Sequence, residues 1–276
     1  MSCVTEGAGY APPVGKRRLD ALLAERGLYE TRSRAAAAVL AGEVRLGGNG
    51  RRAEKPGQLV SEDVDVNVAE APAFVSRGGI KLANALDSFG LHPAGRLCLD
   101  VGASTGGFTD CLLQRGAEAV AAVDVGYGEL DWRLRQDPRV TVLERVNARE
   151  LRPEQLRYRP DLVVADVSFI SLAKVLPAVL SCAADRFDCL ALVKPQFEAG
   201  RDRVGKGGVV RSAGDRRDAL LEVGRFARDE LGLAVLGYAP SGLPGPAGNR
   251  ESFVWLAEGG REGAVDLEAA ARRAEP

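Results

Sequence analysis

The chain has 276 residues and a formal net charge of −1, with 46% hydrophobic and 27% charged residues; this length fits two domains with a sizeable core, while the charge neither predicts nor excludes a nucleic-acid partner. Its five cysteines show no Cys-x-x-Cys spacing and its only histidine is His92, so we expect no disulfide framework, no cysteine-based zinc site and no multi-histidine metal site. The apolar runs are too short to cross a bilayer and no secretory signal is visible, so we expect a cytoplasmic protein without a metal and without membrane contact.

Residues 16–68 are predicted to form a small α+β module, preceded by a disordered leader of residues 1–15. Leucines at helical spacing indicate a first helix that stops near Gly27, and an alanine-rich run indicates a second helix that ends at Gly42. A Gly-Gly-Asn-Gly turn then separates short stretches in which apolar and polar residues alternate, which is typical of half-exposed strands. These predicted strands cover residues 44–46 and 64–68.

A proline-containing linker over residues 69–75 is predicted to separate this module from a larger α/β domain over residues 76–258. Its first helix is expected from Gly79 to Phe89, and apolar strands then alternate with helices. Continuous apolar strands separated by helices indicate a parallel sheet covered on both faces, as in doubly wound, Rossmann-like folds. The tail over residues 259–276 is expected to be a frayed helix or disordered. The predicted strands cover residues 97–101, 119–124, 140–143, 162–166, 189–194, 233–237 and 252–256.

A glycine-rich loop follows the first strand of this domain directly, at the edge where doubly wound sheets bind their ligands. The loop has neither the Gly-x-Gly-x-x-Gly spacing of dinucleotide binders nor the Gly-Lys-Ser/Thr ending of phosphate loops. Asp124, at the end of the next strand, can accept hydrogen bonds from both ribose hydroxyls of an adenosine, and Asn147 can contact the adenine edge. The geometry of Asp124 alone fits a dinucleotide as well as S-adenosylmethionine, and the spacing of the glycine loop favours S-adenosylmethionine. The residues predicted to bind it are Asp100, Gly102, Ala103, Ser104, Thr105, Gly106, Gly107, Phe108, Asp124 and Asn147.

Four charged residues fall where an active site would lie in this fold. Any one of them alone is more often a solvated strand end than a catalyst. Two lysines and two carboxylates at converging strand ends favour an active site, because charges next to apolar strands are costly unless they are paired or functional. The four are Lys81 on the helix before the first strand, Asp166 and Lys194 at the ends of the fourth and fifth strands, and Glu251 before the last strand.

These four residues match the Lys-Asp-Lys-Glu tetrad of FtsJ-like ribose 2′-O-methyltransferases, and the sequence around them resembles the TlyA family. The resemblance extends over most of the chain. It implies S-adenosylmethionine-dependent methyl transfer to the 2′-hydroxyl of a cytidine in the ribosomal RNA of assembled subunits. The segments that carry it are residues 76–82, 166–171, 193–198 and 205–211.

The residue types of the tetrad suit this chemistry. A ribose hydroxyl is a poor nucleophile near neutral pH and needs its proton removed. A lysine can act as the base where burial and nearby cations lower its pKa. We predict Lys194 as the base and Lys81 as a second positive charge. Asp166 is expected to orient Lys194 and to face the cofactor's sulfonium, and Glu251 to position the amine or the ribose.

Residues 16–68 resemble the small RNA-binding module that was first seen in a small-subunit ribosomal protein and is shared with pseudouridine synthases. Arginines cluster around its two predicted helices, although Asp20, Glu25 and Glu30 interleave and leave the module only mildly basic. The loop over residues 201–211, rich in glycine and cations, is predicted to be a mobile lid that adds RNA contacts. The residues predicted to bind RNA are Arg17, Arg18, Arg32, Arg34, Lys55, Arg77, Arg203 and Lys206.

Three other interpretations stay open at this point. A nicotinamide-dependent oxidoreductase would use the same sheet, although the glycine loop argues against it. A membrane-lysing protein is a second, because members of the resembling family have been labelled haemolysins. A non-catalytic ribosome-binding factor is a third, and the tetrad would be superfluous in it. We expect a monomer or a weak oligomer.

Overall fold

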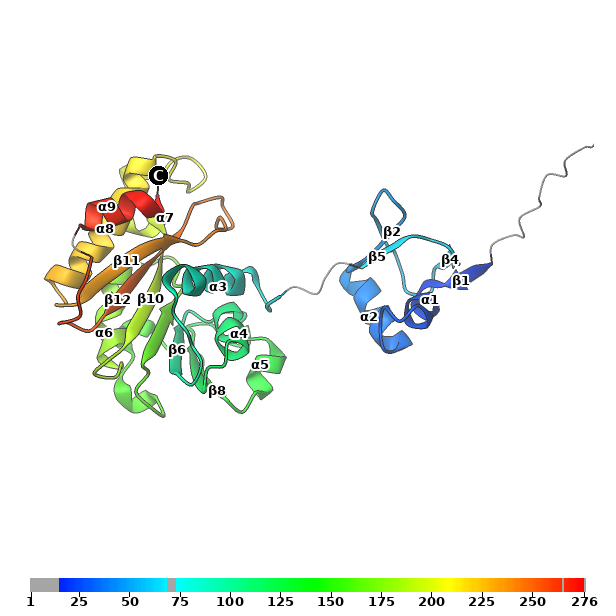
Figure 1. The fold of residues 1–276 in the computed structure, drawn as a ribbon, viewed down its shortest axis with the longest axis horizontal. Coiled ribbons are helices and arrows are strands. Elements are labelled where there is room, and N and C mark those ends of the chain that lie inside the picture. Colours follow the sequence, from blue (N-terminus) through cyan, green and yellow to red (C-terminus); the bar gives the residue numbers. More distant parts are fainter. Residues whose placement is uncertain (1–14, 69–72, 265, 276) are drawn as a thin grey trace, which may run out of the picture. The chain divides into compact units, whose positions relative to one another are not determined.

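The computed structural model describes residues 15–68, 73–264 and 266–275, and the chain divides into two compact units between Pro72 and Ala73 (Figure 1). Residues 1–14 of the expected leader and residues 69–72 of the expected linker lie outside the described residues. Each unit has a hydrophobic core of its own. They are therefore described separately, as the N-terminal unit and the C-terminal unit.

The N-terminal unit packs two helices against short strands. The second helix ends where Gly42 takes a left-handed conformation, with φ of 81°, which glycine adopts without steric cost. Its core is formed by apolar side chains of both helices and by Val44, Ala53 and Val60. Its elements are β1 (Lys16–Arg18), α1 (Leu19–Glu25), α2 (Arg32–Ala41), β2 (Val44–Leu46), β3 (Arg51–Arg52), β4 (Leu59–Ser61) and β5 (Val66–Val68), with β1 paired to β4 and β2 between β3 and β5.

The C-terminal unit is built on a seven-stranded sheet in the order β11-β12-β10-β9-β6-β7-β8. Its helices and strands in chain order are α3 (Arg77–Phe89), β6 (Leu97–Val101), α4 (Gly107–Gln114), β7 (Ala119–Val123), α5 (Trp132–Gln136), β8 (Val140–Leu143), β9 (Leu162–Ala165), α6 (Leu176–Ser181), β10 (Asp188–Val193), α7 (Pro195–Glu198), α8 (Ala213–Asp229), β11 (Ala234–Pro240), β12 (Ser252–Ala257) and α9 (Leu267–Ala274). Short 3₁₀ turns lie at Ala148–Glu150, Pro153–Gln155, Leu172–Lys174 and Arg201–Arg203.

Helices cover both faces of this sheet (Figure 1). One core contains side chains of α3, α4 and α5, and the other contains side chains of α6, α8 and α9. Every residue of the central strands β9 and β10 is buried, which is why these strands appear in the sequence as continuous apolar runs. The expected doubly wound α/β fold is confirmed.

One edge of the sheet differs from the all-parallel arrangement that the sequence predicts. Strand β12 runs antiparallel to both of its neighbours, β10 and β11. Residues 241–251, which join β11 to β12, contain no helix that could carry the chain back across the sheet, so the two strands form a hairpin. The amino end of β12 consequently lies at the same edge as the carboxyl ends of β9 and β10.

The chain's last segment is also better ordered than expected. Residues 267–274 form α9, whose Ala271 and Ala274 are buried against α8 and β11. The next residue, Glu275, accepts a hydrogen bond of 2.8 Å from the buried Arg216. Of the two alternatives expected for this tail, a helix is present over residues 267–274, and disorder is wrong for residues 266–275. Within the described residues, no helix is long and apolar enough to span a membrane.

Candidate active site

Two cavities meet at the carboxyl edge of the sheet, where β7 and β9 lie on opposite sides of β6 and the strand order changes direction. The first, of about 520 Å³, is lined by all four charged residues of the predicted tetrad, and we call it the tetrad cavity. The second, of about 1100 Å³, contains Asp124 and Asn147 in its wall, and we call it the Asp124 cavity. Both cavities share Gly102, Ser104, Asp166, Ser168, Phe169, Gln196 and Phe197.

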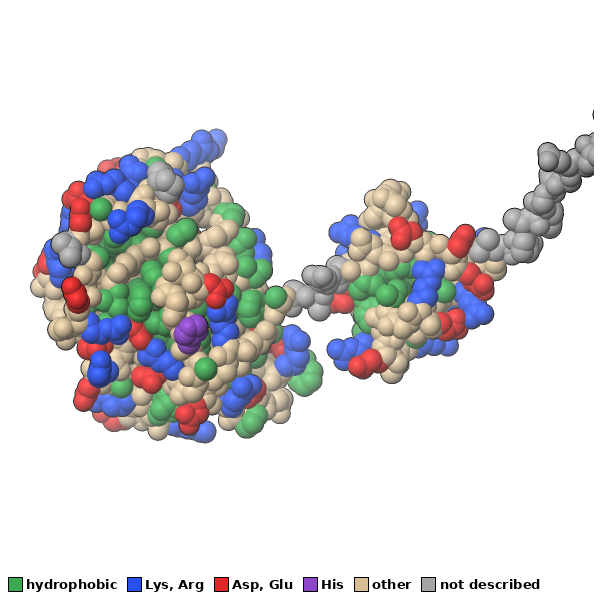
Figure 2. All heavy atoms as spheres, viewed as in Figure 1, with side chains coloured by type: hydrophobic (Ala, Val, Ile, Leu, Met, Phe, Trp, Pro, Cys, Tyr) green, Lys and Arg blue, Asp and Glu red, His purple; other side chains and the backbone are tan. Residues whose placement is uncertain are grey.

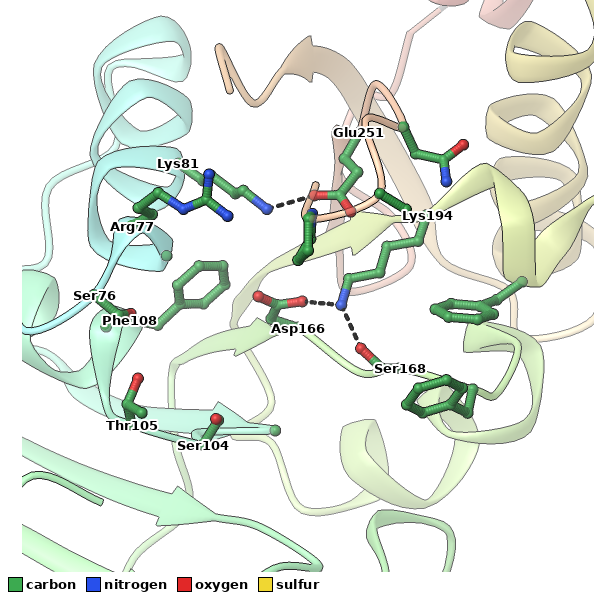
Figure 3. Close-up of a pocket in the computed structure, with 18 of the residues that line it drawn as sticks. Ser76, Arg77, Lys81, Ser104, Thr105, Phe108, Asp166, Ser168, Lys194 and Glu251 are labelled. Carbon is green, nitrogen blue, oxygen red and sulfur yellow. Dashed lines mark hydrogen bonds and ion pairs between the residues drawn. The ribbon is translucent and has the colours of Figure 1, made fainter. Parts of the chain in front are cut away.

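The four tetrad residues form two ion pairs that face the tetrad cavity (Figure 3). Lys81 Nζ donates to Glu251 Oε2 at 2.5 Å, and the two side chains are only 9% and 1% exposed. Lys194 Nζ lies 2.6 Å from Asp166 Oδ1 without hydrogen-bond alignment, and it donates to Ser168 Oγ at 2.7 Å. The deeply buried charges of Lys81 and Glu251 and the half-buried charges of Lys194 and Asp166 are tolerated because each has a partner of opposite sign.

The fold explains how residues far apart in sequence meet here. Lys81 lies on α3, which packs beside α4. Asp166 follows β9 and Lys194 follows β10, so both stand at carboxyl ends of parallel strands. Glu251 precedes its strand, and it reaches the same edge because β12 is reversed.

The glycine loop between β6 and α4 needs residues without side chains where its backbone packs against the segment after β9 and against the start of α3. Gly102 has φ of 82°, and a Cβ at this position would clash with the carbonyl oxygen of Asp166. A Cβ at Gly107 would clash with Ser76, so glycine lets α4 begin against α3. The loop residues in the wall of the tetrad cavity are Gly102, Ala103, Ser104, Thr105, Gly107 and Phe108.

Asp124 is held by backbone groups on both sides. Its Oδ2 accepts from Ser104 N and its Oδ1 from Gly126 N, each at 2.7 Å. Asn147 Oδ1 accepts from Arg149 N at 3.1 Å, which leaves the amide NH₂ of Asn147 for a ligand. Both residues line the Asp124 cavity.

Asp100 and Gly106 are buried and line neither cavity. Asp100 accepts a hydrogen bond of 2.6 Å from Thr109 Oγ1. Burial is the main cause that raises the pKa of Asp100 to about 7, and the charge of Asp166 adds to it. Asp100, in β6, and Gly106, in the loop, therefore lie behind the walls of the two cavities.

Several residues in the cavity walls were missed by the sequence analysis, above all two aromatic side chains. Phe169 is 92% exposed and has φ of 65°, unusual for a residue with a bulky side chain. Its ring lies 5.4 Å from that of Phe197. Ser168 and Asn249 also line the tetrad cavity. Phe169 and Phe197 follow Asp166 and Lys194 by three positions each, and this proximity was the one signal in the sequence.

The predicted RNA-binding residues do not gather in one place. Arg77 lines the tetrad cavity, whereas Lys206 is exposed and lines neither cavity. Arg203 pairs with two carboxylates of α8, at 3.3 Å and 2.9 Å. Figure 2 shows cationic and acidic side chains interleaved on the visible face of the N-terminal unit. There, Arg17 pairs with Glu25 and Glu62, and Arg18 and Arg32 pair with Asp20.

Comparison with known proteins identifies both units. Residues 74–258 match the FtsJ-like methyltransferase family and residues 17–66 match the S4 domain. The 16S/23S rRNA (cytidine-2′-O)-methyltransferase TlyA of Mycobacterium tuberculosis is 53% identical over 243 residues, which cover 87% of this chain and 90% of that protein. Hemolysin A of Brachyspira hyodysenteriae is 40% identical, over 70% of this chain and 80% of its own length.

A solved structure of a candidate hemolysin from Streptococcus thermophilus superimposes with a TM-score of 0.71 at 40% identity, and the match covers 94% of this chain and 95% of that one. The resemblances that the tetrad and the basic module indicate in the sequence are confirmed. The chain belongs to the FtsJ-like methyltransferases of the TlyA type, with an S4 domain ahead of the methyltransferase domain.

Proposed function

We propose that this protein transfers a methyl group from S-adenosylmethionine to the 2′-hydroxyl of a cytidine in ribosomal RNA, acting on ribosomal subunits in the cytoplasm. The observation that supports this most is the presence of two ion pairs, the buried Lys81–Glu251 and the half-buried Lys194–Asp166, around one cavity that adjoins the Asp124 cavity. The S4 domain, and the fact that TlyA relatives are named as rRNA methyltransferases, agree with an RNA substrate.

The Asp124 cavity fits the cofactor. Each carboxylate oxygen of Asp124 already accepts a hydrogen bond from one backbone N–H, and these two bonds fix the orientation of the side chain. Each oxygen keeps a free lone pair that can accept a hydrogen bond from a ribose hydroxyl. Gly102, without a side chain, keeps the passage between the two cavities open next to Asp166. When bound, S-adenosylmethionine supplies an activated methyl group on a positively charged sulfur. Asp166 lines both cavities and would face that charge.

Lys194 would take the proton of the ribose hydroxyl. Asp166 and Ser168 hold its amine at the junction of the two cavities. A lysine accepts a proton only through the lone pair of its neutral amine, so this is the form of Lys194 that would act as the base. Lys81, fixed by Glu251, places a positive charge near the oxygen as it becomes negative.

The exposed aromatic pair suits the base of the target nucleotide. Bases that leave a helical stack are held by stacking on aromatic side chains. Phe169 and Phe197 stand in the walls of both cavities, so a base stacked on Phe169 would bring its ribose to Lys194. Arg77, exposed at the tetrad cavity, is placed to contact a phosphate.

Single-turnover methylation of ribosomal subunits with labelled S-adenosylmethionine tests this function. Lys194→Ala and Lys194→Arg are expected to lower the rate roughly 100- to 10,000-fold, the usual contribution of a general base. Calorimetric titration with S-adenosylmethionine serves as the control, because both variants should bind it almost normally. A near-normal rate in either variant contradicts the role of Lys194, and a label mapped to anything but the ribose of a cytidine contradicts the proposed reaction.

A further inference from the structure

Two loops close one side of the tetrad cavity, and a single buried side chain joins them. The loops cover residues 205–211 and 241–251. Asn249, which is 1% exposed, belongs to the second loop. Its Oδ1 accepts from Val210 N at 2.9 Å and its Nδ2 donates to Gly208 O at 2.8 Å, so both ends of the amide are bonded to the first loop. Asn249 and Gly208 both line the tetrad cavity.

The backbone of Asn249 is tied to the turn that supports Glu251. Gly245 N donates to the carbonyl oxygen of Asn249 at 2.8 Å, and Gly248 N donates to Gly245 O at 2.9 Å. This turn touches the tetrad, because a Cβ at Gly245 would clash with Glu251 Oε1. A shift of Asn249 would therefore move the turn that packs on the carboxylate paired with Lys81.

The 205–211 loop has a second anchor on the side of α8. The buried Arg216 donates to the carbonyl oxygen of Arg211 and to Glu275 Oε2, each at 2.8 Å. Because Arg216 fixes the Arg211 end of the loop, the hydrogen bonds from the loop can hold Asn249 in place.

We propose that Asn249 is a positioning residue for methyl transfer. It links the 205–211 loop to the turn that packs on Glu251 and thereby keeps the Lys81–Glu251 pair in its position at the wall of the tetrad cavity. The proposal rests on the function proposed above. Asn249 acts through Glu251 and needs no contact with the reacting atoms. Removing its side chain leaves the backbone N–H of the buried Val210 without its partner and takes the donor from the carbonyl oxygen of the exposed Gly208, so the loop and the turn must rearrange.

The test is a double-mutant cycle in single-turnover methylation at saturating RNA and cofactor. Asn249→Ala is expected to lower the rate roughly 10- to 100-fold, the scale of an error of about 1 Å in placing a catalytic group. The KM for S-adenosylmethionine should stay within about twofold, because Asn249 does not line the Asp124 cavity. In a Glu251→Gln background, the same substitution should add less than about twofold, since its effect passes through Glu251.

A matched control breaks an ion pair at the opposite end of the same strands. Arg261→Ala removes a 2.8 Å contact with Asp188, the residue that pairs with Ala257 at the far end of β12. It should lower the melting temperature but leave the rate unchanged. Asn249→Asp keeps the acceptor for Val210 N but turns the donor to Gly208 O into an oxygen that repels this carbonyl, so it breaks the same link without creating a cavity and replaces Asn249→Ala in the cycle if the alanine variant does not fold.

Two results would overturn the proposal while leaving the proposed function intact. In one, the fold losses in methylation rate caused by Asn249→Ala and by Glu251→Gln multiply in the double variant, so the two residues act independently. In the other, Asn249→Ala raises only the KM for RNA, which would make Asn249 a binding residue of the loop. A wild-type protein that transfers no methyl group to ribosomal subunits would instead refute the proposed function itself.

Discussion

Asp100 shows how a single buried residue makes the stability of this fold depend on pH. Its side chain is fully buried at the end of β6, and its Oδ1 has no hydrogen-bond partner among the described residues. Burial raises its pKa from 3.8 to about 7. Between pH 3.8 and about 7, the folded protein therefore keeps a proton on Asp100 that the unfolded chain has already released. Because the folded state binds more protons, the free energy of unfolding is larger at the lower end of this pH range.

We predict that the free energy of unfolding contributed by Asp100 falls as pH rises from about 4 to about 7, by about 1.4 kcal/mol for each unit of pKa shift. Asp100→Asn cannot ionise and still accepts from Thr109, so its stability should decline less over this range. Urea unfolding of both proteins at several pH values measures the difference. Parallel pH profiles would show that the pKa of Asp100 is not raised in the folded protein.

At the scale of elements, the apolar runs predict where strands lie but not which way they run. All seven predicted strands of the C-terminal unit are present, because a strand buried on both faces must be apolar along its length. Its direction depends on the connection before it. In an all-parallel sheet Glu251 would stand at the opposite edge from Asp166 and Lys194. The hairpin that reverses β12 brings it to them.

Elements held by distant partners could not be predicted. Strand β1 consists of three exposed cations and forms because residues 59–61 pair with it. The sequence of helix α9 gives little sign of a packed helix, because most of its buried side chains are small alanines. The partner of Glu275 is Arg216, which lies far away in the sequence and meets it only in the folded chain. Asn249 was missed for the same reason: its role comes from two loops whose meeting the sequence does not show.

The segment that carries Asp166 and Phe169 is held at both ends by residues 194–198. Lys194 binds the first end. Glu198, on α7, binds the other by accepting from Ser171 Oγ at 2.6 Å and from Leu172 N at 2.9 Å. Burial raises the pKa of Glu198. This two-point attachment keeps Phe169 in its left-handed conformation.

Glu198→Ala is therefore predicted to lower kcat/KM for RNA roughly tenfold or more, on the scale of a misplaced positioning residue. Glu198→Gln should restore most of it, because its carbonyl oxygen still accepts from Leu172 N while its NH₂ can bond to Ser171 Oγ. Steady-state kinetics on ribosomal subunits, with melting curves as a check on folding, compare the two. Equal losses in both variants would mean that the charge of Glu198, and not its hydrogen bonds, matters.

At the scale of the whole molecule, RNA affinity and chemistry are expected to reside in different units. The tetrad and both cavities belong entirely to the C-terminal unit. In the N-terminal unit, the predicted RNA-binding arginines Arg17, Arg18 and Arg32 are partly neutralised by carboxylates. Arg34 and Lys55 are exposed and have no ion pair among the described residues. These two cations are therefore the ones most available to RNA phosphates.

We predict that Arg34→Ala combined with Lys55→Ala raises the KM for ribosomal subunits while kcat at saturation and the affinity for S-adenosylmethionine stay unchanged. Each lost phosphate contact should reduce the slope of log affinity against log salt by about one. Binding measured at several salt concentrations gives this slope. The control is Arg186→Ala in the C-terminal unit, another exposed cation, whose nearest carboxylate, Glu258, is 3.9 Å away. Two results would mean that the N-terminal unit does not bind RNA through these cations. In one, the double variant shows the same salt slope as Arg186→Ala. In the other, it loses kcat while its KM stays unchanged.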